Sequence, residues 1–236
     1  MKEVAAVLIE KIKRTQTVLS LRFKPEERID FLPGQFLQLI FDQENKSNQS
    51  LNKYLSFSCA PSKDYIEVTK RLSDSQFSQR LVELKEGDLV LVKGPMGSCV
   101  FKEDYSKIAF LIGGIGITPV ISILEHIVDK QLPSDVVLLY SNRSEEETAF
   151  KSELDALSKR NQEIKVNYIV TSCEPKNKDC LFGKIDRDNV LVHVVDYKRR
   201  IFFIFGPPVM VAAMQRICVE IGCIKEMVKT ENFIGY

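Results

Sequence analysis

The pattern of hydrophobic and polar positions changes about one hundred residues into the chain. In the first part, apolar and polar residues alternate in short segments such as Tyr65-Ile66-Glu67-Val68-Thr69, and Pro-Gly or Gly-Asp pairs separate these segments. Alternation with frequent turns is typical of an antiparallel sheet or barrel. The pattern predicts strands over residues 4–14, 17–24, 35–42, 53–59, 64–71 and 88–93, and one helix over residues 75–84.

After Lys107 the apolar residues form continuous runs, which are typical of strands buried on both faces of a parallel sheet. The runs cover residues 108–112, 136–140 and 201–205. Helices are predicted after Pro119, from Ser144, near residues 186–195 and after Pro207-Pro208; Ser144 and Glu147 have the spacing of a capping box. Alternating strands and helices predict βαβ units. We therefore expect an antiparallel β-barrel over residues 1–102, followed by a parallel-sheet α/β domain over residues 103–236.

Charge and composition exclude several functional classes. The 236 residues include 33 Lys and Arg against 32 Asp and Glu, so no net field favours nucleic acid or an anionic membrane. No apolar run approaches the ~20 residues that a bilayer requires. The first residues contain no apolar signal region, so we expect a cytoplasmic protein with neither a membrane nor a nucleic-acid partner. Six scattered cysteines without a C-x-x-C pair indicate free thiols and no metal site.

A glycine turn follows the first apolar run directly. The turn reads Gly113-Gly114-Ile115-Gly116-Ile117-Thr118-Pro119, in which Thr118 can cap a helix and Pro119 suits its first turn. Glycines permit close approach of a ligand, and a helix N-terminus presents free N–H groups to a pyrophosphate. The pattern G-x-G-x-x-P departs from the usual G-x-G-x-x-G, and a tight turn without a ligand is the alternative.

Further motifs accompany this turn in a specific order along the chain. They are Phe31-Leu32-Pro33-Gly34-Gln35-Phe36, Lys53-Tyr54-Leu55-Ser56-Phe57-Ser58, Ser75-Gln76-Phe77-Ser78, Gly94-Pro95-Met96-Gly97, Tyr140-Ser141-Asn142-Arg143, Gly206-Pro207-Pro208-Val209-Met210 and Glu231-Asn232-Phe233-Ile234-Gly235-Tyr236. This succession resembles the ferredoxin–NADP reductase superfamily along essentially the whole chain. The resemblance implies a flavin-binding barrel followed by a nicotinamide-nucleotide-binding α/β domain.

The resemblance also implies an activity and its cofactors. NADPH or NADH would give a hydride to the N5 atom of a flavin; FAD is expected, and FMN is the less favoured alternative. The electrons would then pass to a separate acceptor, such as ferredoxin, an oxygenase component or a small molecule. An acidic acceptor protein would need a basic face, which Lys11-Lys13-Arg14 or Lys198-Arg199-Arg200 could supply.

On the flavin side, the resemblance assigns roles to two segments. Lys53 and Ser56 fall on the family's R-x-Y-[S/T] motif, with Ser56 beside the isoalloxazine as a catalytic candidate and Lys53 near a phosphate. Leu55 replaces the usual stacking Tyr, and Tyr54 lies next to it. The second segment matches a phosphate-binding helix start, and its candidates are Ser75, Phe77 and Ser78.

On the nucleotide side, the resemblance assigns Gly114, Gly116, Thr118 and Pro119 to the pyridine-nucleotide turn. Gly206 and Pro207 match a C-G-P-P segment near the nicotinamide, although Phe205 stands at the Cys position. Phe233 and Tyr236 resemble the terminal aromatic that covers the flavin, with Tyr236 as the second catalytic candidate; ordinary core packing is the alternative. Arg143 follows the second parallel strand and suits a 2′-phosphate, which favours NADPH; a plain surface arginine is the alternative.

Two other functions stay open. The chain could be an electron-transfer subunit of a larger redox complex without its own acceptor activity, similar to that of dihydroorotate dehydrogenase. Such a subunit would carry a cysteine cluster near its C-terminus, where only Cys218 and Cys223 are found. A nucleotide-binding scaffold without redox chemistry is the other alternative, because residues 53, 55, 75 and 205 depart from the family pattern.

Overall fold

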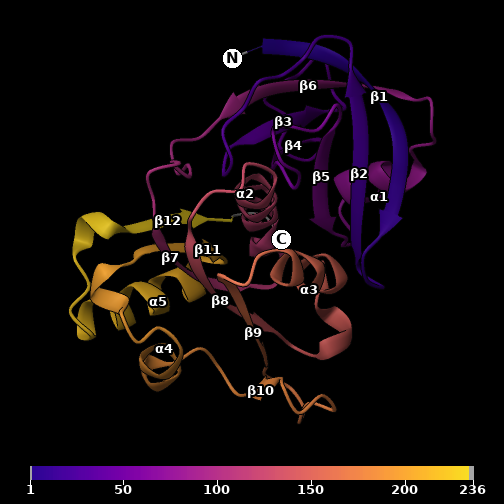
Figure 1. The fold of residues 1–236 in the computed structure, drawn as a ribbon. Coiled ribbons are helices and arrows are strands. Elements are labelled where there is room, and N and C mark those ends of the chain that lie inside the picture. The colour runs from indigo at the N-terminus through magenta and orange to yellow at the C-terminus, as the bar shows by residue number, and fades with distance from the viewer. Residues whose placement is uncertain (1, 234–236) are drawn as a thin grey trace. The chain divides into compact units, whose positions relative to one another are not determined.

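The computed structural model describes residues 2–233. The chain divides into two compact units, namely Met1–Phe101 with Thr118–His126, and Lys102–Ile117 with Ile127–Tyr236 (Figure 1). Within the described residues, no helix has the length and apolar character needed to cross a membrane.

Six antiparallel strands form the first sheet, and their spatial order is β4-β3-β6-β1-β2-β5. Their bounds are β1 Lys2–Lys13, β2 Val18–Pro25, β3 Phe36–Ile40, β4 Asn52–Ser56, β5 Ile66–Arg71 and β6 Leu89–Met96. The two outermost strands approach each other, because Phe57 follows β4 directly and forms an antiparallel bridge with Val68 of β5. The predicted barrel is therefore confirmed, and helix α1 (Gln76–Glu83) interrupts the strands where expected.

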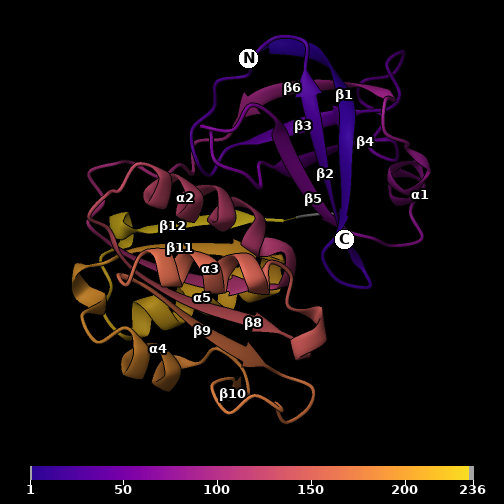
Figure 2. The ribbon, with the colours of Figure 1, turned by 45° about the vertical axis from the view of Figure 1, so that its right-hand side comes forward.

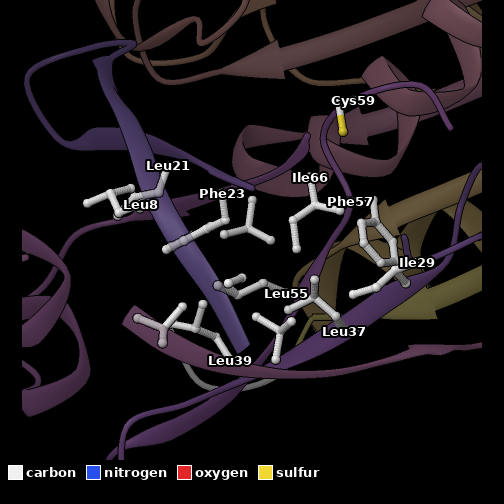
Figure 3. Close-up of a cluster of buried hydrophobic side chains, with 14 of the residues drawn as sticks. Leu8, Leu21, Phe23, Ile29, Leu37, Leu39, Leu55, Phe57, Cys59 and Ile66 are labelled. Atoms are coloured by element: carbon white, nitrogen blue, oxygen red, sulfur yellow. The ribbon is translucent and has the colours of Figure 1, made fainter. Parts of the chain in front are cut away.

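Alternation along the strands fills the barrel with apolar side chains. Leu21 and Phe23 of β2 point into one cluster with Leu37 and Leu39 of β3, and all four are fully buried (Figure 3). Leu55 of β4 belongs to the same cluster. Because successive side chains of a strand point to opposite faces, this packing also determines which residues of β4 face outward.

A buried ion-pair network lies between β1, β2 and β5. Glu67 of β5 is 2% exposed and accepts hydrogen bonds from Arg14 and Arg22, both at 2.8 Å. Arg14 also donates to the hydroxyl of Ser20 at 2.8 Å. The hypothesis that Arg14 contributes to a basic docking face is therefore wrong, because its side chain is 8% exposed and its guanidinium is bound by Glu67 and Ser20.

Six parallel strands form the second sheet in the order β10-β9-β8-β7-β11-β12. Their bounds are β7 Lys107–Gly113, β8 Asp135–Asn142, β9 Ile164–Val170, β10 Leu181–Phe182, β11 Ile201–Gly206 and β12 Val228–Asn232. The three continuous apolar runs are β7, β8 and β11, as predicted. Strands β9, β10 and β12 were not predicted, because β9 and β12 contain polar, partly exposed residues and β10 has only two residues.

Helices cover the parallel sheet on both faces. They are α3 (Lys151–Arg160), α4 (Arg187–His193) and α5 (Pro208–Glu220), and α2 (Ile117–Asp129) connects β7 to β8. Figure 2 shows α3 and α4 on opposite sides of the sheet. Leu111 and Ile204 of the sheet pack in one cluster with Val190 of α4 and Val211 of α5. The alternate residues Phe110 and Phe203 stack 5.4 Å apart.

Two predicted helix starts are corrected. A 3-10 turn (Glu145–Glu147) follows Ser144, and α3 begins only at Lys151, so the capping box is wrong. The backbone is extended at Thr148 and left-handed at Phe150, with a φ of +60°, so no continuous helix can run from Ser144 into α3. Thr118 is not a cap either, because α2 begins at Ile117; Pro119 does lie in the first turn, as predicted.

An ion cluster joins the amino ends of β7, β8 and β11. The guanidinium of Arg200 is 5% exposed and donates to Asp135 at 2.7 Å, to two backbone carbonyls at 3.0 Å and to Asp196. Lys107 also pairs with Asp196. Burial alone would raise the pKa of Asp196, but hydrogen bonds from Lys107 and Arg200 outweigh burial and lower that pKa to about 2. Arg200 is therefore structural, and a docking face at Lys198-Arg199-Arg200 would lack it.

We expect Arg200→Met to lower the free energy of unfolding at pH 7 by about 2–3 kcal/mol, because two carboxylates lose their buried partner. Urea denaturation followed by circular dichroism measures this loss. A carboxyl with a lowered pKa stabilises the fold at neutral pH and stops doing so as the pH falls. The difference between the two proteins should therefore shrink below about pH 4. The exposed Arg199→Met is the matched control, and an equal loss in that variant would contradict the account.

Candidate functional site

Strand β4 presents the first predicted motif on its two faces. Tyr54 is 61% exposed, whereas Leu55 is 8% exposed and packs in the barrel core. The ring of Phe36 meets Tyr54 edge to face, with centroids 5.8 Å apart. Ser56 ends the strand opposite Phe36 and is largely buried. The outward aromatic of this motif is therefore Tyr54, and Leu55 has no face free for a ligand.

The start of helix α1 gathers three hydroxyl groups. Ser75 caps the helix by accepting from the backbone N–H of Ser78 at 3.3 Å. The hydroxyls of Ser73, Ser75 and Ser78 lie 3.1 to 3.3 Å from one another. Phe77 is fully buried, and the centroid of its ring lies 5.4 Å from that of Phe41, so its side chain belongs to the core. Phe77 can therefore contact an anion at this helix end only through its backbone N–H.

Three cationic side chains, those of Lys53, Lys70 and Arg71, lie near one another in the barrel. Lys70 of β5 is 5% exposed and donates to the carbonyl of Arg71 at 2.8 Å. Burial lowers the pKa of Lys70, and the nearby charges of Lys53 and Arg71 lower it further. An anion placed among these three cations would relieve their mutual repulsion. Lys70 and Arg71 were not predicted from the sequence, although they stand shortly before the serine-rich helix start.

The glycine turn closes against β11. A Cβ atom on Gly116 would lie 2.2 Å from the carbonyl oxygen of Phe205 and 2.7 Å from its carbon, so a side chain has no room there. Gly114 has a φ of +52°, and its carbonyl accepts from the hydroxyl of Tyr140 at 3.1 Å. Position 116 therefore requires glycine because the backbone of β11 leaves no room for a side chain. Position 114 favours glycine because its backbone is left-handed.

The turn lies where the strand order reverses. The chain passes from β7 to β8 on one side, while β11 lies beside β7 on the other. Ligands of open α/β sheets bind at the carboxyl ends of strands at such a switch point. Asn142 ends β8 near this edge and is 6% exposed, yet neither atom of its amide has a hydrogen-bond partner among residues 2–233. Buried polar groups normally have partners, so this amide fits a ligand or a water. The sequence motifs assign no role to Asn142.

Phe205 and Phe233 form an aromatic pair at the same edge. Their rings stack 6.5 Å apart, and the backbone N–H of Phe233 donates to the carbonyl of Gly206 at 2.9 Å. Pro207 is exposed and precedes α5. The structure thus brings Phe233 next to Gly206. The other terminal candidate, Tyr236, lies outside the described residues.

Arg143 follows Asn142 and is exposed. Its carbonyl accepts from the backbone N–H of Ser172 at 3.0 Å, which holds this loop beside the end of β9. The acidic turn Glu145–Glu147 comes directly after it. Arg143 therefore stands at the carboxyl end of the sheet, one residue beyond Asn142.

Glu231 of β12 lies opposite Phe205 in the strand register. Burial raises the pKa of its carboxyl group to about 7. A carboxyl with such a pKa can hold or release a proton near neutral pH. This segment was singled out in the sequence only for its aromatics; an acidic residue two positions before Phe233 was the available signal.

Replacing Glu231 with Gln should stabilise the protein at pH 8 by about 2 kcal/mol and have little effect near pH 4.5. The sign follows from the raised pKa: the folded state binds a proton that the unfolded state has lost, so stability falls as the pH rises towards 7. Urea denaturation at the two pH values measures the difference. The exposed Glu226→Gln is the control, and a benefit from E231Q that does not depend on pH would contradict the assignment.

Comparison with known protein families matches almost the whole chain. The oxidoreductase FAD-binding domain matches residues 5–101, and the oxidoreductase NAD-binding domain matches residues 110–216. The chain belongs to the ferredoxin–NADP reductase superfamily. Members of this superfamily are NAD(P)H-dependent flavin oxidoreductases, so the two matched domains bind FAD and a nicotinamide nucleotide.

Curated relatives include proteins of more than one length. A flavohemoprotein of Oceanobacillus iheyensis is 26% identical to this chain over 96% of the chain's length. The chain spans only 58% of the length of that flavohemoprotein. NADH-cytochrome b5 reductase 1 of Aspergillus terreus is 25% identical over 93% of the chain and 78% of its own length.

Solved structures share the fold along essentially the whole chain. The FAD/NAD-binding domain of nitric oxide dioxygenase from Vibrio cholerae has a TM-score of 0.85 at 21% identity, with 98% of both chains covered. A ferredoxin–NADP⁺ reductase from Neisseria gonorrhoeae with bound FAD and NADP has a TM-score of 0.84 at 22% identity, with 98% and 99% covered.

Proposed function

We propose that this chain is a reductase unit that accepts a hydride from NAD(P)H on bound FAD and passes the electrons to a separate acceptor. The observation that carries the proposal is the pair of domain matches, FAD-binding and then NAD-binding, over nearly the whole chain. Bound FAD supplies the step from a two-electron hydride to electrons that leave singly or in pairs.

The barrel, residues 1–102 in this proposal, holds the flavin. Lys53, Lys70 and Arg71 supply positive charge for its pyrophosphate, and the backbone N–H groups of Gln76 and Phe77 donate to the same group, beside the hydroxyls of Ser75 and Ser78. Ser56 lies beside the isoalloxazine, and Tyr54 offers the aromatic face that Leu55 cannot. The repelling cations around Lys70 support this assignment.

Residues 103–236 hold the nicotinamide nucleotide in this proposal. The turn of Gly114 and Gly116, with Thr118 and Pro119 at the helix start, presents backbone N–H groups to the pyrophosphate. Asn142 donates or accepts at the same edge, where its unpartnered amide supports a ligand site. Gly206, Pro207 and Phe233 line the nicotinamide end, and Tyr236 completes it as the second catalytic candidate.

Steady-state oxidation of NADPH and NADH tests this proposal. We expect turnover of the FAD-loaded protein to be slow without an acceptor and to increase strongly when ferricyanide is added. A flavin-loaded protein that ferricyanide does not accelerate would argue against a reductase. For the natural acceptor we propose a separate redox protein, such as a ferredoxin or an oxygenase component. One structural relative is described as the ferredoxin reductase in carbazole 1,9a-dioxygenase, which supports this choice.

For the coenzyme we propose NADPH, with Arg143 as the contact of its 2′-phosphate. Arg143→Gln should then raise KM for NADPH about tenfold, because one charge-assisted contact is lost, and leave KM for NADH unchanged. Initial rates of ferricyanide reduction give both constants. Equal effects on the two coenzymes, or none on either, would contradict the role of Arg143.

A further inference from the structure

The end of helix α5 brings two cysteines together. The backbone N–H of Cys223 donates to the carbonyl of Cys218 at 2.8 Å, and that of Gly222 donates to Val219 at 3.0 Å. Gly222 has a φ of +81°. These bonds and the left-handed glycine define a Schellman turn, in which the residue after the glycine contacts the residue five positions earlier. In this chain both positions are cysteines.

The two thiols differ in exposure. Cys218 is 1% exposed and packs in the cluster between α5 and the parallel sheet, whereas Cys223 is partly exposed and packs against the same cluster. Interaction between the two thiols raises the pKa of Cys218, as burial also does, and the same interaction lowers the pKa of Cys223. Cys223 is therefore the sulfur that ionises first, and it is the one that solvent can reach.

We propose that Cys218 and Cys223 form a modification site, a dithiol that peroxide converts reversibly into a disulfide. The thiolate of Cys223 attacks hydrogen peroxide; an S–O bond forms, the O–O bond breaks, and hydroxide leaves. The sulfur of Cys218 then attacks the sulfenic acid at Cys223; the S–S bond forms, the S–O bond breaks, and the departing hydroxide takes the proton of Cys218 as water. The dithiol loses two electrons, and peroxide is reduced to water. A thiol reductant reverses the bond by exchange.

The disulfide would link the last turn of α5 covalently to the segment that leads into β12. That strand carries Glu231 and is followed by Phe233. The inference does not depend on the proposed function, because it rests on the two side chains and the turn that joins them.

Peptide mapping of the intact protein tests the proposal. Arg216 and Lys225 flank the pair with no basic residue between them, so trypsin releases both cysteines on one peptide, residues 217–225. After treatment with hydrogen peroxide and then iodoacetamide, we expect this peptide to have lost two hydrogen atoms and to carry no alkyl group. Dithiothreitol should restore two alkylation sites. The exposed Cys173, on residues 166–176, is the internal control for ordinary thiol oxidation.

Two outcomes would overturn the proposal. One is a 217–225 peptide that keeps both alkylation sites at peroxide levels that oxidise Cys173. The other is a peptide that gains oxygen atoms without losing the two hydrogens. In Cys218→Ser we expect Cys223 to be trapped by dimedone as a sulfenic acid. In Cys223→Ser we expect Cys218 to remain alkylatable after denaturation, and reaction of the buried thiol first would contradict the order of steps.

Discussion

Replacing Gly116 with valine is expected to lower the rate of flavin reduction by NAD(P)H by about 100-fold or more, because a misplaced nucleotide loses its reacting geometry. The physical cause is local. The new Cβ would stand 2.2 Å from the carbonyl oxygen of Phe205, which belongs to the backbone and cannot rotate away. Either the turn or the end of β11 must move, and both form the proposed nucleotide edge. Stopped-flow absorbance at the flavin band measures the rate.

The valine variant should still bind FAD, because the barrel residues are unchanged. Gly222→Asn is the matched control: this glycine lies in the same unit, no atom lies within 4 Å of its Cβ position, and Asn tolerates its left-handed conformation. If G116V retained flavin and reduced it at the normal rate, the nucleotide site would have to lie elsewhere.

Replacing Lys53 with glutamate should raise the Kd for FAD roughly 100-fold. The variant removes a charge-assisted contact to the pyrophosphate and adds a repelling carboxylate to the proposed anion site. Fluorescence titration of the apoprotein with FAD measures the change. Lys53→Arg should retain binding, since its guanidinium keeps the charge and adds bidentate geometry.

Lys13→Glu provides the matched control for K53E. Lys13 is an exposed residue of the same barrel, and its replacement changes the net charge by the same amount. An equal loss of affinity in both variants would mean that only overall charge matters. Unchanged affinity in K53E would remove Lys53 from the flavin site.

The sequence predicted the fold well where burial is one-sided or complete. Alternation marks the barrel strands because each has one face in the core, and the continuous runs at β7, β8 and β11 reflect burial on both faces. The sequence does not predict strand β12, because Val-Lys-Thr-Glu-Asn has neither a regular alternation of apolar and polar residues nor a continuous apolar run. The predicted start of α3 is too early because Phe150 has a left-handed backbone, which a non-glycine residue rarely adopts and local sequence does not indicate.

For the candidate site, the sequence motifs indicate where the turns lie, but not which residues contact them. The glycine turn could be found from spacing, whereas its contact with Phe205 depends on the pairing of β7 with β11. Lys70, Arg71, Asn142 and Glu231 emerged only from their burial and neighbours. Leu55 and Phe77 show the converse: both stand in motif positions, yet the alternation of β4 and the packing of α1 turn their side chains into the core.

The central claim is that NAD(P)H reduces a flavin bound to this chain. The direct test is an absorption spectrum of the purified protein, reconstituted with FAD where necessary, followed by anaerobic addition of NADPH and then of NADH. We expect the two flavin bands and their bleaching by at least one nucleotide. A protein that stays colourless after incubation with FAD, or a bound flavin that neither nucleotide bleaches, would contradict it.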